Sequence, residues 1–422
     1  MSTPDDLTKM IKEMAVRARK ASRKLASLST AAKNAVLQDM SRLLDERRSL
    51  IQVENGKDLA NGRAKGLSAA MLDRLELSDK VIDSMIQGLA EVTALPDPVG
   101  EISQMAKRPN GLDVGRMRVP LGVIGMIYES RPNVTVDAAV LCLKAGNAVI
   151  LRGGSEAIHS NLVLASILQE ALAGRGINSD AIQVIPVTDR DAVTIMLAQE
   201  EHIDLIIPRG GEGLIRFVAE NSRIPVLKHY KGVCHIYVDS SADLSKINPI
   251  VLNSKVQRPG VCNALEGLLI HRDIAARCLP SLAAELHGAG VELRGCPESV
   301  RLVSGIVPAT DDDWGSEFLG LILCVKVVDS MEEAIEYIEI HGSQHTDVIL
   351  TENYTRARRF MAEVDASAVM INASTRFNDG GQLGLGTEIG ISTTKLHAYG
   401  PMGLEELTTR KFVVFGDGQV RE

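Results

Sequence analysis

The stretch from 247 to 267, INPIVLNSKVQRPGVCNALEG, holds the side chain best suited to covalent chemistry, the thiol of Cys262. A helical pattern ends at Pro259, and Gly260 lets the backbone turn tightly, so we predict that the cysteine lies on a loop. Backbone N–H groups of such a loop can lower the pKa of a thiol and create a nucleophile. Most cysteines are instead small buried hydrophobic residues. The flanking residues here are polar, which leaves both roles open.

Two glycine-bearing segments follow predicted strands and precede predicted helices, a layout that can bind an anion at a helix N-terminus. They are LRGGSEAIHSN, 151–161, and IIPRGGEGLIRF, 206–217. Neither has the G-x-G-x-x-G spacing of dinucleotide-binding loops, so both could also be simple tight turns. The candidate cofactor-binding residues in them are Arg152, Gly153, Gly154, Arg209, Gly210 and Gly211.

Strands and helices alternate twice along the chain, once from about 121 to 229 and again from 234 to 373. Continuous Val/Ile runs such as AVILR and IDLIIP, joined by helices, predict a parallel sheet covered on both faces. PVLKH, 225–229, is predicted to be a further strand of the first sheet. A nucleotide would bind at the carboxyl ends of these strands. The second alternation predicts another α/β domain, with Cys262 near its start.

The remaining segments predict smaller elements around these two domains. The first hundred residues have helical periodicity, and a turn at Asn110 and Gly111 predicts a β-hairpin over 100–119. An isolated hairpin is marginally stable, so we expect it to pair with the predicted strand 411–416 or with another subunit. The glycine-rich segment 372–394 is expected to be a functional or disordered loop.

Composition limits the function classes. A chain of 422 residues is long enough for two or more domains, and its net charge of −8 argues against general nucleic-acid binding. No apolar run reaches membrane-spanning length, and the N-terminus lacks an apolar signal core. We therefore expect a cytoplasmic protein with no membrane partner. No two of the six cysteines lie within four residues of each other, so no zinc-type pair is expected, and they should be free thiols.

Several blocks carry a resemblance to a known family over essentially the whole chain. They include PLGVIGMIYESRPNVTVDAA, KAGNAVILRGGSEAIHSN, VQRPGVCNALE, IHGSQHTDVILTEN and NASTRFNDGGQLGLGTEIG. The chain resembles the aldehyde dehydrogenase superfamily and, within it, the γ-glutamyl phosphate reductase family, for which RPGVCNALE and STRFNDGG are specific. The resemblance implies an aldehyde dehydrogenase-like α/β fold, with two doubly wound α/β domains and a small β-hairpin oligomerisation element.

The same resemblance implies a division of the chain. The NADP-binding domain is expected over 1–228, with the hairpin 98–119 assigned to the oligomerisation element. The catalytic domain is expected over 229–371, and the loop 372–394 should return to the active site and cofactor domain. The region 395–422 is expected to supply the C-terminal oligomerisation strand of a homo-oligomer.

The implied activity is NADPH-dependent reduction of L-glutamate 5-phosphate to L-glutamate 5-semialdehyde with release of phosphate, the second step of proline synthesis from glutamate. Cys262 would attack the acyl phosphate and form a thioacyl intermediate. The resulting oxyanion needs N–H donors, and Asn133 is the candidate side chain, although it could instead cap the helix that starts there. The upstream glutamate 5-kinase is a possible partner.

The sequence departs from acid-forming aldehyde dehydrogenases where they carry the glutamate that activates water. The stretch here is HYKGVC, with His229 at that position. EFLGL matches the block whose glutamate typically holds the nicotinamide ribose, which makes Glu317 and Phe318 candidate cofactor residues. Ser155 stands where a ribose-binding glutamate is common, although Glu156 is adjacent. An Arg152 without an opposing acid suits the 2′-phosphate of NADP(H).

Substrate recognition needs cations for a carboxylate and a phosphate. Arg258, Arg376 and Arg131 are the candidates, since arginine binds such groups in a bidentate way, although most arginines are surface charges. Ser374, in the same block as Arg376, and His345 are further candidates near the substrate. His341 and His345 are four residues apart, but Gly342 and Ser343 argue against a helix and no acidic ligand set is evident. We therefore expect no metal site.

Two other functions remain open from the sequence alone. One is a dehydrogenase of the same fold with another acceptor, such as coenzyme A or water. The other is a nucleotide-binding scaffold without catalysis, against which Cys262 and Glu317 both argue.

Overall fold

The computed structural model describes residues 4–421, and they form two compact units. The first comprises the chain up to Lys228 together with Leu385–Gly390 and the segment from Met402 onward. The second comprises His229–Gly384 and Ile391–Pro401. Among the helices described, none is both long and apolar enough to cross a membrane.

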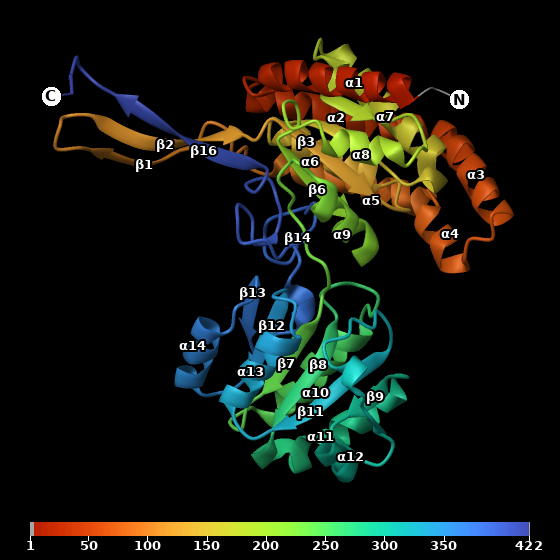
Figure 1. Cartoon of the computed structure of the whole chain (residues 1–422), viewed down its shortest axis with the longest axis vertical. Coiled ribbons are helices and arrows are strands. Elements are labelled where there is room, and N and C mark those ends of the chain that lie inside the picture. The colour runs from red at the N-terminus through yellow and green to blue at the C-terminus, as the bar shows by residue number, and fades with distance from the viewer. Residues whose placement is uncertain (1–3, 422) are drawn as a thin grey trace. The chain divides into compact units, whose positions relative to one another are not determined.

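The first unit is built on a four-stranded parallel sheet in the order β5-β4-β3-β6 (Figure 1). Its strands are β3 (Val123–Tyr128), β4 (Ala148–Arg152), β5 (Ile182–Val184) and β6 (Leu205–Arg209). Nearly every strand residue is buried, which is why the strands appear in the sequence as unbroken apolar runs. The chain winds outward from β3 through β4 to β5 and then returns to the other side of β3. That reversal is the topological switch point at which α/β sheets bind ligands.

Helices cover both faces of this sheet. The helices of the unit are α1 (Pro4–Leu25), α2 (Thr30–Glu46), α3 (Arg48–Ala64), α4 (Ala69–Leu75), α5 (Asp79–Ala94), α6 (Val134–Lys144), α7 (Ile158–Gly174), α8 (Asp191–Leu197) and α9 (Glu212–Asn221). The crossover helices α6 and α7 pack together, α1 packs with α8, and α2, α3 and α5 form a further layer against α6 and α7. The helical character predicted for the first hundred residues is confirmed.

The predicted strand PVLKH is wrong. Only Val226 forms a bridge, to Ile206, and the remainder of the segment is irregular. The segment runs on into the second unit at His229, so it leaves the sheet after one pair of backbone hydrogen bonds.

A three-stranded antiparallel sheet, β1-β2-β16, extends as a separate ribbon of the first unit (Figure 1). It consists of β1 (Ile102–Lys107), β2 (Asp113–Pro120) and β16 (Thr408–Phe415). The turn between β1 and β2 places Gly111 at φ +85°, a conformation that favours glycine. Thr408 to Phe415 pair in register with Pro120 to Asp113, which confirms the expected pairing of the C-terminal strand with the hairpin.

The second unit has a seven-stranded parallel sheet in the order β10-β9-β11-β8-β7-β12-β13. Its strands are β7 (Cys234–Val238), β8 (Leu265–His271), β9 (Glu292–Gly295), β10 (Val307–Pro308), β11 (Ile322–Val328), β12 (Thr346–Leu350) and β13 (Ala368–Ile371), and a short pair, β14 (Ile391–Ser392) and β15 (Gly400–Pro401), lies outside that sheet. The helices are α10 (Leu244–Val256), α11 (Arg272–Gly288), α12 (Pro297–Leu302), α13 (Met331–His341) and α14 (Tyr354–Glu363).

Alternate residues of the central strands face two different cores. Ile236 and Val238 of β7 pack with residues of α10 and α11, whereas Tyr237 between them packs with α13 and α14. The sheet is therefore covered on both faces, as the sequence predicts. Both units have the α/β architecture expected from the strand–helix alternation.

Candidate active site

Cys262 lies on the loop that connects the end of α10 to the start of β8, after the turn at Pro259 and Gly260. It is half-buried and unbridged. Four of the other cysteines are buried, namely Cys142, Cys234, Cys278 and Cys324, and burial raises the pKa of each. Those four thiols stay protonated and inert, so Cys262 combines access with a polar loop, as a nucleophile requires.

The residues around Cys262 sit at the amino ends of parallel strands. Cys262 precedes β8, Gly232 precedes β7, His345 precedes β12 and Glu317 lies in the segment before β11. Ligands of open α/β sheets usually bind at the carboxyl ends. The loops that enter these neighbouring strands bring together side chains that are far apart in the sequence.

Gly232 is packed directly against the backbone of Cys262. A Cβ atom at position 232 would lie 2.0 Å from the Cys262 carbonyl oxygen and 2.6 Å from its Cα. The same carbonyl accepts a hydrogen bond from the thiol of Cys234 at 3.2 Å, and the Gly232 N–H donates to Glu317 Oε1 at 2.9 Å. The segment from Gly232 to Cys234 therefore holds the backbone of Cys262, and Glu317 in turn holds that segment.

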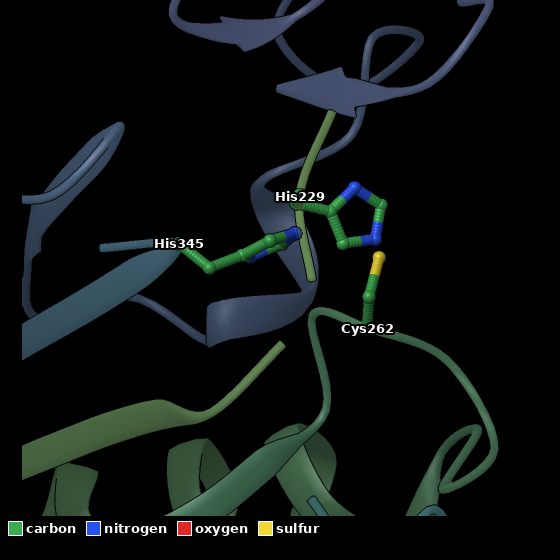
Figure 2. Close-up of side chains that lie close together, drawn as sticks. All are labelled: His229, Cys262 and His345. Atoms are coloured by element: carbon green, nitrogen blue, oxygen red, sulfur yellow. The ribbon is translucent and has the colours of Figure 1, made fainter. Parts of the chain in front are cut away.

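His229 and His345 flank the sulfur of Cys262 (Figure 2), and one ligand-type atom of each of the three residues lies within 4.8 Å of the other two. Figure 2 shows the sulfur beside the His229 ring nitrogen that is not bonded to Cγ, which is Nε2. The two imidazole rings are nearly perpendicular, with centroids 5.5 Å apart and an interplanar angle of 71°. No carboxylate belongs to this cluster in the described part of the chain.

His345 is fully buried and linked to a polar network. Its Nδ1 lies 2.8 Å from the Thr346 hydroxyl, which accepts a hydrogen bond from Asn378 Nδ2 at 2.8 Å. Burial, together with the nearby His229, lowers the pKa of His345 to about 3. His345 is thus uncharged throughout the neutral range.

Four buried polar atoms from the segments around Cys262 have no hydrogen-bond partner within residues 4–421. They are Asn263 Oδ1, His345 Nε2, Thr375 Oγ1 and Asn378 Oδ1. Leaving a buried polar atom unpaired costs about 1–3 kcal/mol, and such atoms call for an explanation. The Asn263–Asn378 hydrogen bond, 2.9 Å, joins two of these segments, and we take them as a candidate polar ligand site.

The predicted substrate residues of the second unit lie in two neighbouring segments. Arg376 is half-buried and donates through Nε to Gln257 Oε1 at 2.8 Å, one residue before the exposed Arg258. Burial lowers the pKa of Arg376, and it is within electrostatic reach of Arg258 and Cys262. The Ser374 hydroxyl lies 2.9 Å from the Ser254 hydroxyl and caps the turn at Arg376, so it positions the loop that carries this arginine.

A buried ion pair lies beneath the loops that carry Cys262 and Glu317 and connects the elements next to them. Lys255 Nζ lies 2.6 Å from Glu266 Oε2, and both side chains are inaccessible to solvent. Burial raises the pKa of Glu266, whose other oxygen accepts from the Leu319 N–H at 3.3 Å. The pair thereby connects α10 and β8 to the loop of Glu317 and Phe318, the two cofactor residues predicted in this unit.

The glycine pairs of the first unit lie where the sequence predicts, at the carboxyl ends of β4 and β6. Arg152 is buried and donates to the carbonyl oxygens of Gly153, Thr188 and Asp189, at 2.5, 3.2 and 3.2 Å. Its Nε and the amide nitrogen of Asn161 are buried donors without a partner in the described chain. A Cβ at position 153 would lie 2.1 Å from that amide nitrogen, so only glycine fits there.

Carboxylates occupy part of the same edge. Glu156, next to Ser155, accepts from the Ser130 N–H at 2.8 Å. Glu129 accepts from the Gly211 N–H at 3.0 Å and is within 2.5 Å of a Cβ placed on Gly210.

Three further predicted residues, Arg209, Asn133 and Arg131, lie in or after the strands of the first unit's sheet. The guanidinium of Arg209 lies beside Gly390, at φ +140°. Asn133 stands at the N-cap position of α6, but its amide donates to Asp137 at 3.0 Å and makes no capping bond. Asn133 and Arg131 belong to the first unit, and their predicted roles toward the substrate stay predictions.

Several residues of the site were not identified from the sequence. Cys234 looks like the start of a strand, and Thr346 and Asn378 are ordinary polar residues of matching blocks. Lys255 and Glu266 are eleven positions apart on a helix and a strand, with no motif to connect them. Among these residues, only Gly232 could have been predicted. A glycine where a strand begins, next to a polar segment, can indicate that another backbone packs closely against it.

Replacing Gly232 by alanine should disable the site while the fold survives. The new Cβ would overlap the Cys262 carbonyl, so the loop that carries the nucleophile must shift. We expect kcat to fall by about 100-fold or more, because displacement by about 1 Å can cost that factor, and the thermal midpoint to change by a few degrees. Gly213→Ala, on exposed backbone with nothing within 4 Å of its Cβ, is the matched control. Wild-type turnover in Gly232→Ala would contradict the packing described here.

Comparisons with known proteins place this geometry in a family. A profile of the aldehyde dehydrogenase family matches residues 1–293. The chain is 68% identical over 415 residues to the γ-glutamyl phosphate reductase of Desulfotalea psychrophila, covering 98% of this chain and 99% of that one. It is similar to the crystal structure of the Thermotoga maritima γ-glutamyl phosphate reductase, with a TM-score of 0.96, 49% identity, and coverage of 98% and 100%.

A more distant structure shows the fold alone. An acetylating aldehyde dehydrogenase from Geobacillus thermoglucosidasius aligns with a TM-score of 0.71 at 17% identity, over 99% of this chain and 98% of that one. The high identities over whole chains and the family profile agree with the blocks that carried the resemblance in the sequence. The chain belongs to the aldehyde dehydrogenase family and, within it, to the γ-glutamyl phosphate reductases.

Proposed function

We propose that this enzyme reduces L-glutamate 5-phosphate to L-glutamate 5-semialdehyde with a nicotinamide cofactor and releases phosphate, the second step of proline synthesis from glutamate. The observation that carries the proposal is the environment of Cys262: a half-buried thiol flanked by two histidines, in a cluster to which no carboxylate of residues 4–421 belongs. Such a site can form a thioester but lacks the carboxylate base with which related dehydrogenases hydrolyse it. An acyl phosphate, in contrast, needs only a nucleophile and cations.

In the proposed mechanism the Cys262 thiolate attacks the acyl carbonyl carbon, and the C–O bond to phosphate breaks. Thiolates serve well here because they are strong nucleophiles and good leaving groups. The unpaired amide and hydroxyl oxygens of Asn263, Thr375 and Asn378 suit the ammonium group of the substrate. Arg376 and Arg258 supply positive charge for its anionic groups.

The cofactor, when bound, supplies a hydride to the thioester carbon. Two buried donors without partners, Arg152 Nε and Asn161 Nδ2, lie at the switch-point edge of the first unit, where a dinucleotide phosphate fits. Ser155, Arg209, Gly210 and Gly211 border the same strand ends, and we assign Glu317 and Phe318 to the nicotinamide ribose. Burial lowers the pKa of Arg152 and the nearby Arg190 lowers it further, whereas Glu156 and Asp189 act in the opposite direction. Arg152 and Arg190 together give two cations for a 2′-phosphate. These features support NADP(H).

The partners and location expected from the sequence stay predictions. Exposed apolar side chains on the ribbon, among them Ile102, Met105, Phe412 and Val414, support a homo-oligomer formed through it. The upstream glutamate 5-kinase and the cytoplasm fit a labile phosphorylated substrate.

Cys262→Ser should abolish reductase activity but retain cofactor binding. A serine hydroxyl at its ordinary pKa is too weakly ionised to replace a thiolate. We expect less than about one-hundredth of wild-type kcat, with an unchanged cofactor Kd measured by fluorescence. Cys296→Ser, at the other half-buried cysteine, is the control, and a Cys262→Ser enzyme within about tenfold of wild type would refute the assignment.

Phosphate should be required for turnover in the reverse direction. With glutamate semialdehyde and NADP⁺ but no phosphate, the thioester should persist, and NADPH should appear as a burst near one equivalent per active site. Adding phosphate should start steady turnover. Sustained NADPH formation with free glutamate would identify a hydrolytic dehydrogenase, and turnover restored by coenzyme A instead of phosphate would identify an acyl-CoA-linked enzyme.

The enzyme should prefer NADPH over NADH. The 2′-phosphate adds two negative charges near Arg152 and Arg190, and each charge-assisted contact is worth roughly 1.5–3 kcal/mol. We expect kcat/KM for NADPH to exceed that for NADH by about tenfold or more, and Arg190→Ala to reduce the ratio. Equal kcat/KM values for NADPH and NADH would show that these arginines do not bind the 2′-phosphate.

A further inference from the structure

We propose that the two histidines beside Cys262 have different roles: His229 accepts the thiol proton through Nε2, whereas His345 remains neutral and donates a hydrogen bond to the thiolate. The inference rests on the proposed function, because the thiolate is the nucleophile of that reaction. It adds a catalytic base to a site in which the carboxylate of related enzymes is replaced by a histidine.

The orientation of His229 fixes which of its nitrogens can accept a proton. His229 Nδ1 lies 2.7 Å from the carbonyl oxygen of Ile391, in β14. A carbonyl oxygen only accepts hydrogen bonds, so Nδ1 must carry a hydrogen and donate it. In the neutral ring Nε2 then carries the lone pair, and Figure 2 shows that this nitrogen is the one beside the Cys262 sulfur. The carbonyl of Ile391 also stabilises the imidazolium that forms.

The network around His345 indicates the opposite tautomer. The Thr346 hydroxyl accepts from Asn378 Nδ2, whose identity as the nitrogen is supported by its second bond, to the His345 carbonyl at 3.4 Å. We assign the hydroxyl hydrogen to His345 Nδ1, 2.8 Å away. Cys234, 3.7 Å from the same nitrogen, donates its thiol hydrogen to the Cys262 carbonyl. His345 Nε2 therefore carries a hydrogen, and it is a buried donor without a partner in the described chain.

Burial separates the two histidines further. His345 is fully inaccessible, and its pKa of about 3 prevents it from accepting a proton near neutral pH. His229 is only half-buried, so the imidazolium formed there keeps contact with water. We therefore assign the cluster to proton transfer.

The step is balanced within the protein. The S–H bond of Cys262 breaks, an N–H bond forms at His229 Nε2, and the electron pair stays on sulfur, with nothing oxidised or reduced. The thiolate then attacks the acyl phosphate, and the imidazolium returns its proton to the departing phosphate. Opposite charges at this separation stabilise each other, which lowers the pKa of the thiol.

Other ionisable groups act on the same pair. Those on its own segment and on the elements packed against it are Tyr230, Lys231, Cys234, Glu317, Arg258 and Arg376. The arginines favour the thiolate and the glutamate opposes it. Their effects remain in a variant that changes only His229, so such a variant isolates the contribution of the imidazole.

The first test measures the ionisation of Cys262 without any substrate. The rate of alkylation by iodoacetamide is followed against pH in the full-length protein with Cys296→Ser and a chelator, and the modified peptide is identified by mass spectrometry. We expect the wild-type rate to be already high at pH 7. In His229→Gln the thiol should titrate at a higher pH than in wild type, because the imidazolium no longer stabilises the thiolate, with the rate at pH 7 reduced by about tenfold or more. His287→Gln, an exposed histidine of α11 in the same unit, is the control.

The second test uses the reverse reaction with saturating phosphate and cofactor. If His229 is the base, the activity of His229→Gln relative to wild type should rise as the pH approaches 9, because the thiol then ionises unaided. His229→Asn, which can keep a donor toward the Ile391 carbonyl but has no base, should behave alike. A purely structural role would give a defect that is independent of pH.

His345→Gln separates the donor from the base. Glutamine retains an N–H donor in place of Nε2–H and cannot titrate. The alkylation rate of this variant should therefore depend on pH as it does in wild type, with a rate that is already high at pH 7. An alkylation profile of His229→Gln that superimposes on wild type would overturn the proposal, as would a profile of His345→Gln that matches the one expected for His229→Gln. Because alkylation needs no substrate, either result would leave the proposed reaction untouched.

Discussion

The constraint on which the site depends is the contact between Gly232 and the backbone of Cys262. Because position 232 has no side chain, the segment entering β7 lies against the loop entering β8, and the Glu317 carboxylate can accept the Gly232 N–H. His229 lies three residues before Gly232 in the same segment. The contact of Gly232 with Cys262 therefore also brings the His229 imidazole beside the sulfur. A larger residue would separate the base from the nucleophile.

The second element of the site is a set of polar groups buried without partners. Burial keeps His345 neutral and leaves its Nε2–H unsatisfied. Three oxygens, from Asn263, Thr375 and Asn378, share that condition. Without ligand, these unpaired polar atoms lower the stability of the folded protein. The ammonium and carboxylate groups of a substrate can supply the missing hydrogen-bond partners. Binding energy is thereby directed to the polar end of the substrate, away from the reacting carbon.

The sequence predicted much of this architecture. Apolar runs gave all the central strands of both sheets, and Pro259 and Gly260 correctly placed Cys262 on a loop before β8. Local pattern could not show that the catalytic loops meet at the amino ends of the strands, since that depends on the order in which strands join the sheet. PVLKH failed as a strand because the chain leaves the first unit there, and apolar composition carries no information about such a departure.

Side-chain roles were harder to predict than backbone positions. The charge of Arg152 predicts a role toward the cofactor, yet its guanidinium donates hydrogen bonds to three carbonyl oxygens. Nothing in the sequence spacing indicates those bonds. The block that contains Ser374 predicts a place near the substrate, and in the structure Ser374 positions the loop of Arg376. The sequence places His229 where related enzymes carry a carboxylate, but the role we propose for it depends on the tautomer set by Ile391, 162 residues away.

The central claim, that Cys262 forms an acyl enzyme, can be tested most directly by trapping that species. The enzyme is mixed with glutamate semialdehyde and oxidised cofactor without phosphate, quenched in acid, and digested for mass spectrometry. The account predicts one glutamyl group on the peptide that contains Cys262, removed when phosphate or hydroxylamine is added before the quench. A peptide that stays unmodified while the cofactor is reduced, or a glutamyl group on another residue, would contradict it.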